Sequence, residues 1–156
     1  MSRGRRKRPI AAGAPDERVW RTTIRSDLAE VGNANRALEE FLSSSGLSLE
    51  LAFSAVLALE EVVTNVIKYG FDENRKQEIS IAATIGNDEL VLEFVDSGRE
   101  FDPLAAPPPD FDRCHEEREV GGLGIHILKR IAQRMDYERR RGKNVLTLCF
   151  SLVPPK

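Results

Sequence analysis

Apolar residues recur at helical spacing along two stretches of the chain, which predicts two long helices. The first helix follows a capping residue, Ser26 or Asp27, and ends near Gly46, which tolerates the left-handed conformation common at helix ends. The second helix follows the cap Ser48 and ends at Gly70. Its apolar side is formed by Leu51, Ala55, Leu59, Val62 and Val66.

Strict alternation of apolar and polar residues marks the half-buried strands. In residues 77–85 every second residue is apolar, so the apolar side chains share one face of the strand. Residues 90–94 continue the pattern after the turn at 86–88, which predicts a hairpin over residues 77–95. Residues 19–24 are rich in strand formers and predict a strand before the first helix. A second hairpin is expected from strands 137–140 and 145–152 around the turn at 141–143.

A third helix is expected to begin at the glycine-rich segment 121–124 and to run to about Arg134. The element order is then strand, helix, helix, strand, strand, helix, strand, strand. Hairpins imply antiparallel pairing, and the helices must cover one face of the sheet. The predicted fold class is α+β, a two-layer sandwich with a mostly antiparallel sheet and about three helices on one face.

Composition adds bounds on function. The chain has 156 residues, 41% hydrophobic and 31% charged, which is typical of one globular domain. Residues 1–16 show no periodicity and are expected to be a disordered basic tail, leaving residues 17–156 as the domain. No apolar run is long enough to span a bilayer, so no membrane partner is expected. Cys114 and Cys149 lack metal-type spacing and are expected to be free thiols in a reducing cytoplasm.

Charge is distributed unevenly. The first ten residues hold five of the 23 basic residues and no acid, so the rest of the chain carries 18 basic against 25 acidic residues. An acidic body argues against nucleic-acid binding as the main activity. The basic tail could contact nucleic acid or anionic lipid, but a solvated end has the same composition.

A polar pair lies on the second helix. Glu61 and Asn65 are four residues apart, and residues at this spacing are neighbours on one helix face. They are flanked by apolar residues that favour burial, and a polar pair buried without partners is costly. A metal ion and a water would supply such partners. A solvated polar edge on an amphipathic helix would show the same spacing.

The segment Asp96-Ser97-Gly98 follows the strand that ends the first hairpin. A buried carboxylate there can accept a hydrogen bond from an exocyclic amine such as that of adenine. Gly98 lets the backbone approach a flat ligand closely because it has no side chain. A plain turn would use the same residues, since Asp and Gly are common in turns.

The glycines Gly121, Gly122 and Gly124 precede or open the third helix. Exposed backbone N–H groups at a helix N-terminus favour anions, which suits phosphate. The Gly-Lys-Ser/Thr ending of a P-loop is absent, and the segment follows a loop, unlike a Rossmann fingerprint. A flexible hinge would have a similar composition.

Together, the three segments resemble the N, G1 and G2 boxes of the GHKL ATP-binding superfamily. The runs Glu61–Asn65, Asp96–Pro103 and Gly121–Ile125 look most like those of the bacterial anti-sigma-factor serine kinases, and the resemblance covers about residues 18–152. It implies a Bergerat-type ATP-binding fold. It also implies ATP and Mg²⁺ as cofactors.

The resemblance assigns a role to each matching position. Glu61 would be the general base, preferred over Glu60 because it lies four residues before Asn65, and Asn65 would bind Mg²⁺. Asp96, beside Gly98, would read adenine, and the glycines at 121, 122 and 124 would wrap the phosphates. The segment between Pro103 and Val120 would be the ATP lid.

Three departures from the family pattern stand out. Tyr69 occupies a position where many relatives have histidine, and Arg99-Glu100 replaces a second glycine of the G1 box, which would make nucleotide affinity modest. Arg118 is the nearest candidate for the family's arginine before the G2 glycines, at a shifted spacing.

The resemblance implies an ATP-dependent protein-serine kinase that is also an anti-sigma factor. It would phosphorylate an antagonist protein on serine and sequester a sigma factor in the cytoplasm, and a homodimer is left open. Two alternatives remain: an ATP-binding interaction module without phosphate transfer, and a stand-alone histidine-kinase-like ATPase domain.

Overall fold

The computed structural model describes residues 17–72, 76–105 and 122–154. Five antiparallel strands form one sheet in the order β1-β2-β3-β5-β4. The strands are β1 (Arg18–Arg25), β2 (Glu78–Ile85), β3 (Glu89–Asp96), β4 (Arg134–Arg140) and β5 (Lys143–Ser151). Both hairpins predicted from the alternation are present.

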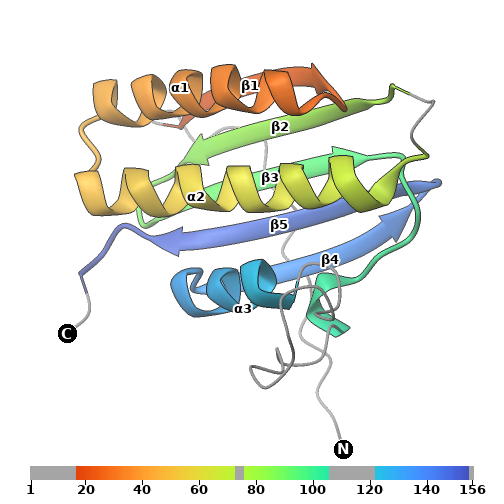
Figure 1. Cartoon of the computed structure of the whole chain (residues 1–156). Helices are drawn as coiled ribbons and strands as arrows, with labels where there is room; N and C mark the ends of the chain where they lie inside the picture. Colours follow the sequence, from red (N-terminus) through yellow and green to blue (C-terminus); the bar gives the residue numbers. More distant parts are fainter. Residues whose placement is uncertain (1–16, 73–75, 106–121, 155–156) are drawn as a thin grey trace, which may run out of the picture.

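Three α-helices lie on one face of this sheet (Figure 1). They are α1 (Leu28–Ser44), α2 (Leu49–Asn65) and α3 (Gly122–Ile131). A π-helical turn, Val66–Gly70, continues α2, and a short 3-10 turn spans Pro103–Ala105. The α+β two-layer prediction is confirmed.

The helix caps are those that the sequence predicted. The Asp27 side chain accepts a hydrogen bond from the N–H of Ala29, and the Ser48 hydroxyl accepts one from Leu51. Gly46 lies just beyond α1 with a φ of 79°, in the left-handed region that favours glycine. Both long helices therefore begin, and α1 also ends, where the local sequence satisfies the free backbone groups.

The core lies between the helices and one face of the sheet. Alternate residues of β2 and β3 are buried there, as the alternation predicted. The helix side contributes the fully buried Leu38, Leu42 and Leu59. Of the side chains predicted for α2, Leu51 and Val66 are only partly buried, while Ala52, Ala58 and Val63 are buried in addition. No helix in the described part of the chain is long and apolar enough to cross a membrane.

The third helix ends earlier than expected. It stops at Ile131 rather than near Arg134, and β4 begins at Arg134 rather than Tyr137. The N–H of Gln133 donates to the carbonyl of Cys149, and Arg134 pairs with Cys149 in the sheet. Gln133 and Arg134, which helical periodicity would have assigned to α3, therefore pair with β5 instead.

One end of the sheet gathers the segments singled out in the sequence. β3 ends at Asp96, which is paired with Asn144 near the start of β5. The C-terminal end of α2 and its π-helical turn lie over the same end, toward the right of Figure 1. π-Helical turns inside or after α-helices are frequent at functional sites.

Candidate functional site

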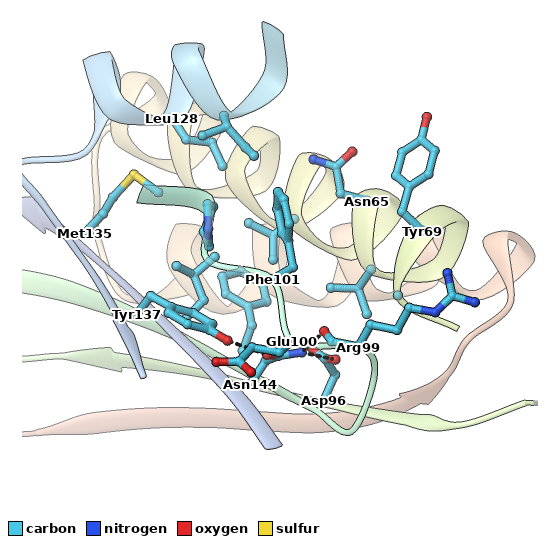
Figure 2. Close-up of a pocket in the computed structure, with 17 residues that line it drawn as sticks. Asn65, Tyr69, Asp96, Arg99, Glu100, Phe101, Leu128, Met135, Tyr137 and Asn144 are labelled. Carbon is cyan, nitrogen blue, oxygen red and sulfur yellow. Dashed lines mark hydrogen bonds between the residues drawn. The ribbon is translucent and has the colours of Figure 1, made fainter. Parts of the chain in front are cut away.

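A cavity of about 310 Å³ opens at this end of the molecule, between the helices and the sheet. This volume is at the lower end of the range for small-molecule sites. Figure 2 shows Asn65 on the helix side of the cavity and Asp96 on the sheet side. Most of the lining is apolar or aromatic, from Val62, Val66, Tyr69, Phe94, Phe101, Pro103, Ile125, Leu128, Met135, Tyr137 and Leu146. Such a lining suits a flat, mainly apolar ring.

Asp96 provides a buried carboxylate in this cavity, with only 6% of the residue exposed. Its Oδ1 atom accepts hydrogen bonds from the N–H of Gly98, at 2.8 Å, and from Nδ2 of Asn144, at 3.0 Å. Within the described residues, both hydrogen bonds that the carboxylate accepts go to Oδ1. The second oxygen, Oδ2, is therefore the one that can accept a hydrogen bond from a ligand.

Gly98 lies where the turn after β3 touches the end of the α2 segment. A Cβ atom at this position would lie 2.7 Å from the carbonyl oxygen of Gly70 and 2.8 Å from Oδ1 of Asp96. The N–H of Arg99 donates to the same Gly70 carbonyl at 2.9 Å. Glycine is therefore needed here because two backbone segments meet with no room for a side chain.

Glu61 and Asn65 lie on the last turns of α2, as their spacing predicted. Asn65 lines the cavity, whereas Glu61 lies beside it against Gly124 of α3. A Cβ atom added to Gly124 would lie 3.1 Å from the Glu61 carboxyl carbon and nearer still to Oε2. Glu60, the alternative acid, is exposed, while Glu61 is half-buried.

The glycine-rich segment is described only in part. Gly122 is the first residue of α3 and Gly124 lies in its first turn, so α3 begins at the site as predicted. Gly121 and Arg118 lie outside the described residues, as does most of the segment expected to form a lid. The two residues that stand in place of a second G1 glycine, Arg99 and Glu100, both line the cavity.

Three polar residues of the site were not predicted from the sequence: Tyr137 and Arg139 of β4 and Asn144 of β5. The Tyr137 hydroxyl donates to Oδ1 of Asn144 at 2.7 Å, and Arg139 donates to the same oxygen at 3.0 Å. Burial, and then the charge of Glu100, raises the pKa of Tyr137, which keeps its hydroxyl protonated and able to donate. Asn144 follows a turn, where asparagine is common, so its sequence position carried no signal.

Among the residues that the structure describes, a divalent cation at this site would need a phosphate ligand in addition to protein oxygens. The described residues contain no group of three His, Cys, Asp or Glu side chains able to hold a metal by themselves. Mg²⁺ is usually bound through one or two protein oxygens, with waters and substrate phosphates completing its shell. The single carboxamide oxygen of Asn65 at the cavity fits that mode.

Comparisons with known proteins show the family to which the chain belongs. A family model described as the histidine kinase-like ATPase domain matches residues 24–150. The serine/threonine-protein kinase BtrW of Bordetella bronchiseptica is 26% identical over 117 residues, covering 75% of this chain and 82% of that protein. The anti-sigma F factor of Clostridium acetobutylicum is 27% identical over 130 residues, covering 77% and 85%.

A solved structure gives an independent view of the fold. The RsbU and RsbW domains of a Mycobacterium tuberculosis protein superpose with a TM-score of 0.58 at 15% sequence identity. The match covers 85% of this chain and 32% of that one, so this chain spans about a third of the solved protein's length. At this identity the likeness shows a shared fold.

Proposed function

The chain belongs to the histidine kinase-like ATPase domain family, and we propose on that premise that it is an ATP-dependent protein-serine kinase and anti-sigma factor. It phosphorylates an antagonist protein on serine and, when not so engaged, sequesters a sigma factor, which places it in the cytoplasm. The curated relatives support this, because they are named as a serine/threonine-protein kinase and as an anti-sigma factor.

One observation carries the proposal. The buried carboxylate of Asp96 and the carboxamide of Asn65 face the same cavity from opposite sides, and Glu61 lies one helical turn before Asn65. The residues that we propose for base recognition, metal binding and proton transfer lie at one end of the sheet. Phosphoryl transfer depends mainly on such positioning and on charge stabilisation.

Each residue has a distinct task in the proposed reaction. Oδ2 of Asp96 accepts a hydrogen bond from the adenine amine, and backbone N–H groups at the start of α3 face the phosphates. Asn65 would hold Mg²⁺, which supplies neutralisation of phosphate charge when bound. Glu61 takes the proton of the serine hydroxyl as the serine oxygen forms a bond to the γ-phosphorus and the bond to the leaving ADP oxygen breaks.

A transfer assay tests the proposal directly. The protein is incubated with γ-labelled ATP, Mg²⁺ and a candidate antagonist, and phosphate on the antagonist's serine is measured. We expect incorporation that disappears when that serine is replaced by alanine. Saturable ATP binding without transfer to any antagonist tested would instead support an interaction module that uses ATP only to set its conformation.

A substitution of Asp96 tests the base-recognition step. In Asp96→Asn, an amide N–H₂ group replaces Oδ2. This donor would then face the adenine amine, which is also a donor, and no hydrogen bond could form. A hydrogen bond to a charged group is worth about 1.5–3 kcal/mol, so ATP affinity should fall about tenfold or more. Isothermal titration calorimetry measures this change, and thermal melting checks that the fold is retained.

Glu93→Gln is the matched control for this substitution. Glu93 lies on the same strand, three residues earlier, and faces the opposite side of the sheet because strand side chains alternate. It should bind ATP like the wild type. Equal ATP affinity for Asp96→Asn and the wild type would remove Asp96 from the nucleotide site.

A further inference from the structure

Asn144 is one of only two buried polar or charged residues found in the described part of the chain, and the other is Asp96. It is 7% exposed and lies in β5 between Asp96 of β3 and Arg139 of β4, its partners in the sheet register. Burying a carboxamide is costly unless its hydrogen bonds are satisfied. The hydrogen bonds of the Asn144 side chain therefore indicate its role.

All four hydrogen-bonding positions of the Asn144 amide are occupied. Nδ2 donates to Oδ1 of Asp96 at 3.0 Å and to the carbonyl oxygen of Arg99 at 2.8 Å. Oδ1 accepts from Tyr137 at 2.7 Å and from Arg139 at 3.0 Å. An amide has two donors and room for two acceptor contacts, so none is left for a ligand. Figure 2 shows Asn144 beside Asp96 at the sheet side of the cavity.

The partners fix the orientation of this amide. A rotation that exchanged its oxygen and nitrogen would place N–H groups against two donors, Tyr137 and Arg139, and an oxygen against two acceptors. Arg139 also donates to the carbonyl of Gly98 at 2.8 Å, which ties the same network to the turn after β3. Fully satisfied networks of this kind are rigid, so Asn144 presents its N–H₂ group to Asp96 in one direction.

The fixed amide of Asn144 restrains the carboxylate of Asp96. Oδ1 of Asp96 receives the donors of Asn144 and Gly98, so its rotation about the terminal bond is restrained and Oδ2 is left for the cavity. We propose that Asn144 is a positioning residue that holds Oδ2 of Asp96 toward the ligand and thereby sets selectivity for a purine with an amino group over one with an oxo group. This inference rests on the proposed nucleotide site and assigns its specificity.

The test compares ATP with inosine triphosphate, in which an oxo group replaces the adenine amine. Affinities of the full chain for both nucleotides are measured by calorimetry with Mg²⁺ present. The wild type should prefer ATP. In Asn144→Ala the carboxylate of Asp96 keeps only the hydrogen bond from Gly98, so Oδ2 is held less firmly toward the ligand. The preference for ATP should then fall by up to about tenfold, the effect of one charged hydrogen bond, while affinity for inosine triphosphate changes little.

A purely structural role for Asn144 makes a different prediction. Both nucleotides would then lose affinity by the same factor, and the preference for ATP would stay unchanged, which would overturn the inference and leave the kinase proposal standing. A wild type with equal affinity for the two nucleotides would also overturn it. A wild type that binds neither would contradict the proposed function itself.

Tyr137→Phe keeps the inference testable if Asn144→Ala does not fold. It removes one donor to Oδ1 of Asn144 and keeps the aromatic ring that lines the cavity. The amide retains Arg139, so the preference for ATP should fall in the same direction but less, by about threefold, in keeping with a neutral hydrogen bond. An unchanged preference for ATP in a folded Tyr137→Phe would contradict the inference.

Discussion

Replacing Glu61 by Gln is expected to lower the rate of phosphate transfer about 10²–10⁴-fold, the usual effect of removing a general base, and to leave ATP binding close to that of the wild type. The substitution keeps the size of the side chain and removes its ability to take a proton. Glu61 lies beside the cavity rather than in its lining, so it has little contact with the nucleotide to lose. The effect should therefore appear in kcat rather than in ATP affinity.

Two neighbouring substitutions serve as controls for Glu61→Gln. Glu60 is exposed on the adjacent helix position, so Glu60→Gln should transfer phosphate at the wild-type rate. Asn65→Ala removes the carboxamide that lines the cavity and should weaken Mg²⁺-dependent ATP binding. Transfer at the wild-type rate by Glu61→Gln, with loss of transfer in Glu60→Gln, would assign the base to Glu60 instead.

The fold could be predicted where one face of an element is buried and the other is not. Strands β2 and β3 alternate cleanly because the helices cover only one face of the sheet, and α1 and α2 carry caps in their own sequences. Strand β4 was predicted too short because it is an edge strand with mostly polar residues. Only Met135 and Tyr137 of that strand pack against the core, which gives too few positions for a clear period.

The candidate site could be predicted where its residues belong to one local segment. Spacing placed Glu61 and Asn65 on one helix face, and the alternation of the preceding residues placed Asp96 at the end of a strand. The Asn144 network could not be predicted, because it joins residues up to 48 positions apart through sheet pairing. The contact between Glu61 and Gly124 is likewise a meeting of two helices that no local pattern encodes.

The contact between Glu61 and Gly124 leads to the second prediction with a large expected effect. Replacing Gly124 by Ala is expected to slow phosphate transfer about 10²-fold without unfolding the protein. The new methyl group would overlap the Glu61 carboxylate, which is the far end of a flexible side chain and can move aside. Alanine also favours a helix over glycine by about 1 kcal/mol, which offsets the crowding. A displacement of about 1 Å in a reacting group can cost about 10²-fold in rate.

Double substitution separates this effect from a role of Gly124 in phosphate binding. If Gly124 acts by leaving room for Glu61, the variant Gly124→Ala/Glu61→Gln should be no slower than Glu61→Gln alone, because the base is already lost. If Gly124 instead contacts the phosphates, the two losses should multiply and ATP affinity should fall.

Gly32→Ala is the matched control, since Gly32 also lies in a helix and its added Cβ would meet nothing closer than 3.8 Å. It should raise the melting temperature and leave transfer unchanged, which would exclude a general effect of alanine in a helix as the cause of the loss in Gly124→Ala.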